Sequence, residues 1–197
     1  MQQPLTIDQV RQRTPSVYAV EPWPCVSAKY SFLSSAVVLD ALAKENIVPY
    51  SAKQGRVRDL DRTAYTKHVL RFRPLEYKQN VKIVGDVYPE IVLTNSHDRA
   101  SCFALDLGLF RLVCLNGMMT AAGVFNSFRV RHMGATIDNV IEATYKIIDD
   151  FPRLLDSVER SKMVPMNRIR NIEYAMKAQA IRWPDSAKAN EPQTLLL

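Results

Sequence analysis

Short runs of alternating apolar and polar residues dominate the middle of the chain, from about residue 47 to residue 131. Alternation with a period of two is typical of strands that bury one face, and Gly, Pro, Asn and Asp separate the runs. The expected strands are VPYSAKQGRVRD, KHVLRFRP, EIVLTN, ASCFALDL, LFRLVCL and SFRVRH. Asn116-Gly117 predicts a tight hairpin turn, because both central positions of a type I′ turn need a positive φ. We therefore predict an antiparallel meander.

Helical spacing replaces this alternation on both sides of the predicted sheet. Before it, residues 36–46 repeat apolar side chains every three to four positions after a pair of serines that suit an N-cap. After it, an apolar stripe that follows Thr136 predicts a long helix, interrupted or kinked at Pro152. A last helical segment is expected at 166–183.

The predicted fold class is α+β, with an antiparallel meander sheet flanked by an N-terminal helix and a long C-terminal helix. Four prolines in the first 30 residues exclude a long helix after residue 14, so we expect residues 1–30 to form an arm laid over the domain. Residues 31–183 are predicted to form a single α+β domain, and residues 184–197 a C-terminal tail.

Composition narrows the class of protein. The 26 Lys and Arg against 20 Asp and Glu give a net charge of +6, which suits an anionic partner. No apolar run is long enough to cross a membrane, and the start lacks the apolar stretch of a signal peptide, so we expect no membrane association and a cytoplasmic protein. Three cysteines without a C-x-x-C pair are interpreted as small core residues.

Three predicted strands carry an Arg-x-Arg triplet, at 56–58, 71–73 and 129–131. Residues i and i+2 of a strand point to the same side, so each triplet places two guanidinium groups together. Like charges on neighbouring strands repel, and a phosphate backbone would relieve that repulsion. The alternative is a half-solvated sheet whose outer face is basic. The candidate nucleic-acid-binding residues are Lys53, Arg56, Arg58, Lys67, Arg71, Arg73, Arg129 and Arg131.

The stretch NSHD places Asn95, Ser96, His97 and Asp98 between two apolar runs. A metal site needs several converging ligands, and three histidines without H-x-x-x-H or H-x-H spacing do not supply them. We interpret NSHD as a polar turn between strands, in which Asn and Asp side chains bond their own backbone. Cys102 and Cys114 lie in apolar runs, where a buried thiol stays inert. No catalytic residue, metal or cofactor is predicted, because no phosphate-binding, dinucleotide or serine-hydrolase motif is present.

The segments GRVRDLDRTAYTKHVLRFRP, PEIVLTNSHDRAS and FRLVCLNGMM resemble those of a domain-of-unknown-function family, family 932, found in phages and plasmids and including YfjQ/YafZ-like prophage proteins. The resemblance covers residues 7–182 and implies a mobile-element protein in the cytoplasm of a bacterial host. The expected order of elements is also similar to that of the Rad-type and Erf-type single-strand annealing proteins, which hold single-stranded DNA in a basic groove of an oligomer.

Three functions stay open from the sequence. The first is a phage or plasmid DNA-binding protein that binds or anneals single-stranded DNA in recombination, without a cofactor and as a homo-oligomer, rather than an enzyme. The second is an anti-defence or regulatory protein that binds a host protein through the same basic face. The third is a metal-dependent nuclease that uses His97 and Asp98.

Overall fold

The computed structural model describes residues 3–75, 87–112 and 119–183. The predicted turn at Asn116-Gly117, the predicted tail and Cys114 lie outside these residues. The chain forms two compact units, Met1–Leu155 and Asp156–Leu197, and each is described by itself. The boundary between the units falls within the segment 31–183 that the sequence predicts as a single domain.

A five-stranded antiparallel sheet forms the centre of the first unit. Its strands are β1 (Ile47–Gln54), β2 (His68–Pro74), β3 (Val87–Asn95), β4 (Phe103–Leu112) and β5 (Met119–Val130). They lie in the order β1-β2-β3-β4-β5, so each strand pairs with its neighbour in sequence. The predicted antiparallel meander is therefore confirmed.

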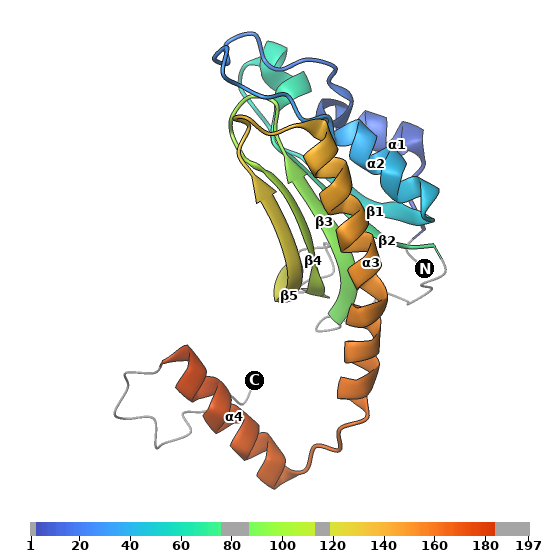
Figure 1. Ribbon diagram of the computed structural model, residues 1–197, viewed down its shortest axis with the longest axis vertical. Helices are drawn as coiled ribbons and strands as arrows, with labels where there is room; N and C mark the ends of the chain where they lie inside the picture. Colours follow the sequence, from blue (N-terminus) through green and yellow to red (C-terminus); the bar gives the residue numbers. More distant parts are fainter. Residues whose placement is uncertain (1–2, 76–86, 113–118, 184–197) are drawn as a thin grey trace. The chain divides into compact units, whose positions relative to one another are not determined.

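Helices precede and follow the sheet, which confirms the α+β class. They are α1 (Ile7–Arg13), α2 (Ser35–Lys44), α3 (Ile137–Lys162) and α4 (Arg168–Arg182), with the 3-10 helices η1 (Pro15–Tyr18) and η2 (Leu60–Tyr65). Figure 1 shows the first part of α3 running along the sheet, with α1 and α2 nearer to β1. α3 continues through Pro152 rather than ending there. Within the described part of the chain, no helix is both long and apolar enough to cross a bilayer.

One side of the sheet, which we call the helix face, packs against α2 and α3. Leu70, Leu93 and Leu105 form a row across β2, β3 and β4, and all three side chains are fully buried. Two hydrogen bonds place the helices on this side: Ser35 of α2 contacts His68 at 2.7 Å, and Asn126 donates to Asp150 of α3 at 2.7 Å. The helices contribute Val38, Leu42, Val140, Ile147 and Phe151 to the core. Each such buried side chain stabilises the fold by roughly 1.5–3 kcal/mol.

The N-terminal arm is integrated into the first unit. Val10 of α1 and Val17 of η1 are fully buried. Backbone hydrogen bonds join Leu5 N–H to the Pro49 carbonyl of β1 at 2.7 Å, and Trp23 N–H to the His97 carbonyl at 2.9 Å. The arm predicted at residues 1–30 therefore lies against both β1 and the loop that follows β3.

Candidate functional site

The other side of the sheet, which we call the arginine face, carries the predicted basic residues of the strands. Register places Lys53, Val69, Thr94, Ala104 and Arg129 in one row across all five strands. Side chains of directly paired residues share a side, and alternation puts Arg71, Arg73 and Arg131 on that side too. The predicted pairing of Arg71 with Arg73 and of Arg129 with Arg131 on one face agrees with this register, and the register adds Lys53 to that face.

Arg71 and Arg73 were expected to form part of an open cationic surface. Instead, both form ion pairs with Glu90 of β3. Arg73 Nε donates to Glu90 Oε1 at 2.6 Å, and the side chains of Arg73 and Glu90 are only 3% and 1% exposed. Arg73 also lies over the rings of Tyr50 and Tyr88, with its Cζ 5.1 and 5.0 Å from their centroids. This cluster therefore cannot present Arg73 to an external phosphate.

Arg129 occupies an intermediate position on the arginine face. Its Nη2 donates to Asp106 Oδ2 at 3.1 Å, and its side chain is 62% exposed. An exposed ion pair of this kind contributes only about 0–1 kcal/mol, so the guanidinium can exchange its partner at little cost. Glu90 and Asp106 were not recognised as partners from the sequence, because the register that brings them opposite the arginines depends on how β2, β3 and β4 align.

Lys53, Lys67 and Arg131 are exposed and have no ion-pair partner among the described residues. Gly55 N–H donates to the Lys67 carbonyl at 2.7 Å, which extends the pairing of β1 and β2 by one residue beyond Gln54 and His68. Lys67 therefore lies diagonally across from Lys53 on the same face. These three cations and Arg129 form the accessible positive charge at one end of the arginine face.

Arg56 and Arg58 do not lie in a strand, contrary to the sequence prediction. β1 ends at Gln54, and both arginines are exposed in the loop that leads to η2. Asp59 caps η2 by accepting from Asp61 N–H at 3.1 Å, so the chain turns away from the sheet here. The two side chains are accessible, but they lie outside the paired row on the arginine face.

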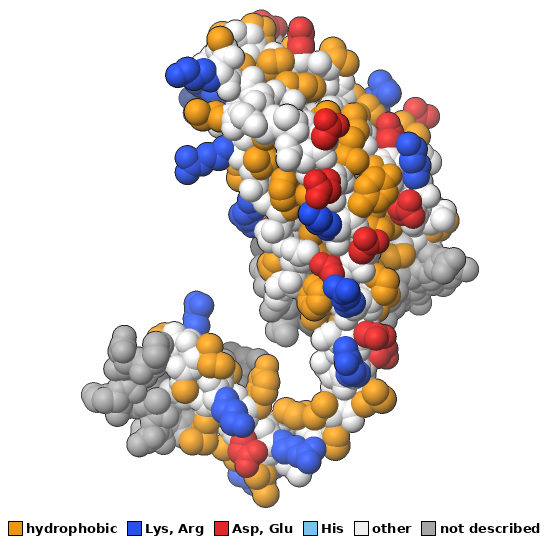
Figure 2. All heavy atoms as spheres, in the orientation of Figure 1, with side chains coloured by type: hydrophobic (Ala, Val, Ile, Leu, Met, Phe, Trp, Pro, Cys, Tyr) orange, Lys and Arg blue, Asp and Glu red, His pale blue; other side chains and the backbone are white. Residues whose placement is uncertain are grey.

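The helix side of the molecule has a different charge pattern. Figure 2 shows acidic and basic side chains interspersed over α3. Several of its basic residues are balanced within the helix, through the pairs Glu142–Lys146, Asp150–Arg153 and Glu159–Lys162. Unbalanced positive charge in the first unit is therefore more pronounced on the arginine face than along α3.

The NSHD stretch begins at Asn95, the last residue of β3, and is buried, although it forms the predicted turn. Asn95, Ser96 and His97 are fully buried, and Asp98 is 6% exposed. Asn95 Oδ1 accepts from Ser96 N–H at 2.8 Å, and Asp98 Oδ1 accepts from Ala100 N–H at 2.9 Å, which confirms the predicted bonds to the local backbone. Asp98 also accepts from Arg62 Nε at 2.8 Å, which ties η2 to this turn.

Asn95 links NSHD to two neighbouring segments. Its Nδ2 donates to the Leu33 carbonyl and to Ser35 Oγ, both at 2.9 Å, while Oδ1 accepts from Ser96 N–H, so the orientation of the amide is fixed. His132 Nε2 lies 2.9 Å from Asn95 Oδ1, and its Nδ1 lies 3.0 Å from the Ser31 carbonyl oxygen. The side chain thus joins β3, α2 and the segment after β5.

The hydrogen bonds continue from Asn95 through the buried His68. Ser35 Oγ, which accepts from Asn95, donates to His68 Nε2 at 2.7 Å. Ser16 Oγ donates to Gln54 Oε1 at 2.7 Å, so it accepts from His68 Nδ1 at 2.9 Å. This arrangement defines a neutral imidazole protonated on Nδ1, and burial lowers the pKa of His68 to about 4.

His97 lies beside His68 but outside this hydrogen-bond chain. Its ring is 5.4 Å from that of His68 and 4.8 Å from that of Phe32, centroid to centroid. Neither ring nitrogen has a hydrogen-bond partner among the described residues. Burial, with a smaller effect of His68, lowers the pKa of His97 to about 3. No group of three His, Cys, Asp or Glu residues in the described ranges is placed to hold a metal ion.

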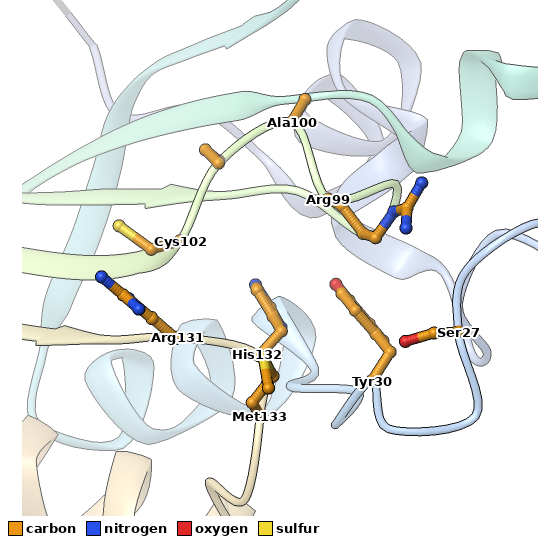
Figure 3. A pocket seen from close by; sticks show the side chains of 9 residues that line it. Ser27, Tyr30, Arg99, Ala100, Cys102, Arg131, His132 and Met133 are labelled. Carbon is orange, nitrogen blue, oxygen red and sulfur yellow. The ribbon is translucent and has the colours of Figure 1, made fainter.

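A pocket of about 420 Å³ opens next to NSHD, between residues 27–30, the loop 99–102 and residues 131–133. Figure 3 shows Arg99 and Cys102 on one side of this pocket and Arg131, His132 and Tyr30 on the other. Sequence reasoning missed the contributions of Arg99, Tyr30 and His132. The nearest signal was that Arg99 directly follows NSHD.

The cysteines differ from their prediction as core residues. Cys25 and Cys102 are both exposed as free thiols. Cys102 precedes β4 and lines the pocket, because the buried part of the apolar run begins only at Phe103. The expectation of an inert, buried Cys102 is therefore wrong.

Comparison with known proteins gives a consistent result. A family model described as "Domain of unknown function (DUF932)" matches residues 23–194. Two proteins of Escherichia coli (strain K12) are similar over 151 residues, or 77% of this chain: UPF0380 protein YafZ at 37% identity and UPF0380 protein YfjQ at 36%. The chain spans about half of each of these relatives, 53% of their length. No solved structure matches the chain.

Proposed function

The chain belongs to the DUF932 family, and from the surface of its own sheet we propose that it binds single-stranded nucleic acid, DNA in the first instance. The observation that carries the proposal is the exposed positive charge at one end of the arginine face. Lys53 and Arg129 end a row whose inner members, Val69, Thr94 and Ala104, carry no charge.

The chemistry of this row suits a phosphate backbone. Lys67 and Arg131 lie on the same face, each two residues beyond the row, so accessible cations occur at both edges of the sheet. Phosphate contacts from Lys and Arg supply most sequence-independent affinity, and arginine forks bind phosphate oxygens in pairs. A strand lying across the five β-strands would contact the cations at both edges and cover the neutral side chains between them.

Arg71 and Arg73 have a different role in this proposal. Their shared partner Glu90 holds them within the sheet, so they stabilise the site and do not contact the strand. The proposed contacts are therefore Lys53, Lys67, Arg129 and Arg131, with Arg56 and Arg58 available from the adjacent loop.

A titration with a labelled single-stranded oligonucleotide at two salt concentrations tests this proposal. The logarithm of the affinity should fall with the logarithm of salt, at a slope of about −0.7 for each phosphate neutralised. The double substitution Lys53→Glu and Lys67→Glu should weaken binding and make the slope shallower. Lys146→Glu with Arg153→Glu on α3, which reverses two exposed charges outside the arginine face, serves as the matched control.

Two results would reject the proposal. One is an affinity that does not depend on salt. The other is an equal effect of the control substitutions and of the Lys53 and Lys67 substitutions, because that would assign binding to net charge rather than to this face. Duplex DNA and single-stranded RNA of the same length, titrated in parallel, identify the preferred nucleic acid.

Annealing in recombination, a homo-oligomer and the cytoplasm of a bacterial host are parts of the same proposal. α4, taken by itself, supports an oligomer, because no side chain on it is buried and it exposes Ile169, Ile172, Tyr174 and Met176. Ile169, Ile172 and Met176 recur at i, i+3 and i+7 and so share one face, which is typical of a helix that packs against another chain. Particle size measured with and without Ile172→Glu tests this step.

The other two functions have less support. Binding of a host protein through the same face predicts capture of a specific partner and no affinity for oligonucleotides. A metal-dependent nuclease needs accessible ligands, whereas His97 is fully buried and Asp98 is engaged by Arg62. Divalent-metal-dependent cleavage that is lost on His97→Ala would support the nuclease function instead.

A further inference from the structure

We propose that the pocket beside NSHD binds a nucleotide that carries phosphate groups on both the 3′ and the 5′ side of its sugar, as each internal nucleotide of a strand does. The inference rests on the proposed function, because it assigns one nucleotide of the bound strand to a defined place. Arg131 belongs both to the arginine face and to the pocket, so a strand on that face would reach the pocket directly.

The size of the pocket suits this ligand. Its volume of about 420 Å³ lies within the range of roughly 300–1,000 Å³ that is common for small-molecule sites. A single phosphate or another small inorganic anion would leave most of this space unfilled. Room for a base and a sugar is therefore available in addition to phosphate.

The charges of the pocket lie at its two ends. Arg131 extends toward one end and Arg99 toward the other, with His132 and Tyr30 between them (Figure 3). Both arginines are exposed, and neither has an ion-pair partner among the described residues. Two separated cations match two phosphates that flank one sugar better than they match one phosphate group.

The backbone at Arg99 is held in an unusual conformation. Its φ of 68° lies in the left-handed region, which costs a residue with a side chain on the order of 1 kcal/mol. The turn keeps this conformation because Asp98 accepts from both Ala100 N–H and Arg62 Nε, at 2.9 and 2.8 Å. Strain of this kind is typical of residues whose side chain must be held in one place for binding.

The middle of the pocket is preorganised. The rings of Tyr30 and His132 stack, with centroids 4.6 Å apart and planes 9° from parallel. The Tyr30 hydroxyl donates to the Ser96 carbonyl at 2.9 Å, and the two ring nitrogens of His132 lie 3.0 and 2.9 Å from the Ser31 carbonyl and Asn95 Oδ1, so both rings are fixed in position. Met133, 65% exposed, adds an apolar surface against which a base can lie.

One polar atom of the lining lacks a partner. The hydroxyl oxygen of Ser101 is buried and has no hydrogen-bond partner among the described residues. A buried hydroxyl without a partner costs about 1–3 kcal/mol. A sugar hydroxyl or a base edge in the pocket would provide the missing bond.

The experiment uses a nucleoside 3′,5′-bisphosphate as the probe, with the 5′-monophosphate and inorganic phosphate for comparison, in calorimetric titrations of the full chain. The bisphosphate should bind about tenfold more tightly than the monophosphate, since one charge-assisted contact is lost in the latter. Of Arg99→Ala and Arg131→Ala, the substitution at the 5′-phosphate should weaken the binding of both nucleotides, and the substitution at the 3′-phosphate should remove that difference. Arg153→Ala on α3 should leave it unchanged.

Cys102 supplies an independent readout, because it lines the pocket as an exposed free thiol. The bisphosphate should slow its alkylation, followed by mass spectrometry of each cysteine, while Cys25 in the same molecules keeps its rate. Equal affinities for bisphosphate and inorganic phosphate, or no protection of Cys102, would overturn the inference.

Parallel oligonucleotide titrations separate the two proposals. In one outcome the protein does not bind the bisphosphate, and its oligonucleotide binding is lost with the Lys53 and Lys67 substitutions but unaffected by Arg99→Ala. This outcome rejects the pocket proposal alone. Bisphosphate binding with Cys102 protection, in a protein that binds no oligonucleotide, rejects the proposed function and identifies a free nucleotide as the source of the ligand.

Discussion

Arg73 and Glu90 form an ion pair whose two side chains are almost completely withdrawn from solvent, and Arg71 shares the same carboxylate. Two guanidinium groups on one carboxylate leave the cluster with a net positive charge. The rings of Tyr50 and Tyr88 beside Arg73 offset part of that charge through their π-electrons. This pair explains why two of the most prominent basic residues in the sequence belong to the structure of the sheet.

Glu90→Gln should destabilise the fold strongly. Removing the charge leaves two guanidinium groups without a counter-ion in a buried site, which typically costs about 3–5 kcal/mol. Urea unfolding at neutral pH measures the loss. Asp106→Asn, which removes the partner of the exposed Arg129, is the matched control and should cost about 0–1 kcal/mol. Equal losses in the two variants would contradict the structural role of Glu90.

Gly108→Ala should destabilise the pairing of β4 and β5. A Cβ at Gly108 would lie 2.3 Å from the backbone carbonyl oxygen of Gly123, at a point where the register of the two strands shifts. One strand must then move, and overpacking of this kind costs about 1–3 kcal/mol. Gly123→Ala meets nothing within 4 Å and should be nearly neutral in the same thermal unfolding experiment. A reversed order of the two variants would show that the strands are not in this register.

The buried histidines should make the fold sensitive to mild acid. The pKa values of His68 and His97 are lowered to about 4 and about 3, below the unfolded value of 6.5. The unfolded chain therefore takes up protons first as pH falls. The stability that these groups contribute is complete above about pH 6.5 and decreases as pH falls from there to about 4 for His68 and about 3 for His97, by about 1 kcal/mol per pH unit for each group. Urea unfolding at a series of pH values measures this slope.

The two histidines should respond differently to replacement by phenylalanine. His97→Phe removes a ring without hydrogen-bond partners among the described residues, so stability at pH 7 should be kept and the acid sensitivity reduced. His68→Phe removes the acceptor of the buried Ser35 hydroxyl and the donor to Ser16 Oγ, and the unsatisfied Ser35 hydroxyl alone should cost about 1–3 kcal/mol. A large loss of stability from His97→Phe would show that its ring nitrogens do have partners.

Asn95→Asp tests the direction of the hydrogen bonds at NSHD. A carboxylate at this position would face the Leu33 carbonyl, to which the amide Nδ2 now donates at 2.9 Å. Repulsion between two acceptors in a buried site should lower the midpoint of thermal unfolding by several degrees, since about 1–3 kcal/mol is lost. Asp98→Asn, which keeps the bond to Ala100 and weakens only the pair with the partly exposed Arg62, should have a smaller effect.

Sequence patterns predicted the features that depend on neighbouring residues, namely the strands and the hydrogen bonds within turns. Alternation defined most of the strands and the shared side of Lys67, Arg71 and Arg73, and Asn95 and Asp98 form the predicted bonds in their turn. Burial could not be read in the same way. Whether Arg73 faces solvent or Glu90 depends on the register of β2 and β3, and a charged residue is usually exposed.

The pocket could not be predicted from the sequence for a related reason. Tyr30 and His132 stack although they lie about a hundred residues apart, and no spacing rule connects them. The Arg-x-Arg triplet at 56–58 was wrongly predicted to lie in a strand, because alternation continues past Gln54 in the sequence while the chain leaves the sheet after Gly55 and enters η2, which Asp59 caps.

The pairing of the strands and the pairing of Ser31 with His132 differ in how far apart the partners lie in the sequence, and this has a consequence for the order of folding. Each β-strand finds its partner in the next strand, whereas Ser31 N–H bonds to the His132 carbonyl, and His132 Nδ1 bonds to the Ser31 carbonyl across a separation of 101 residues. Closing so long a loop is entropically expensive and slow relative to hairpin formation. The strands should therefore acquire protection from hydrogen exchange first, and the histidines should be sealed from water only in the last kinetic phase.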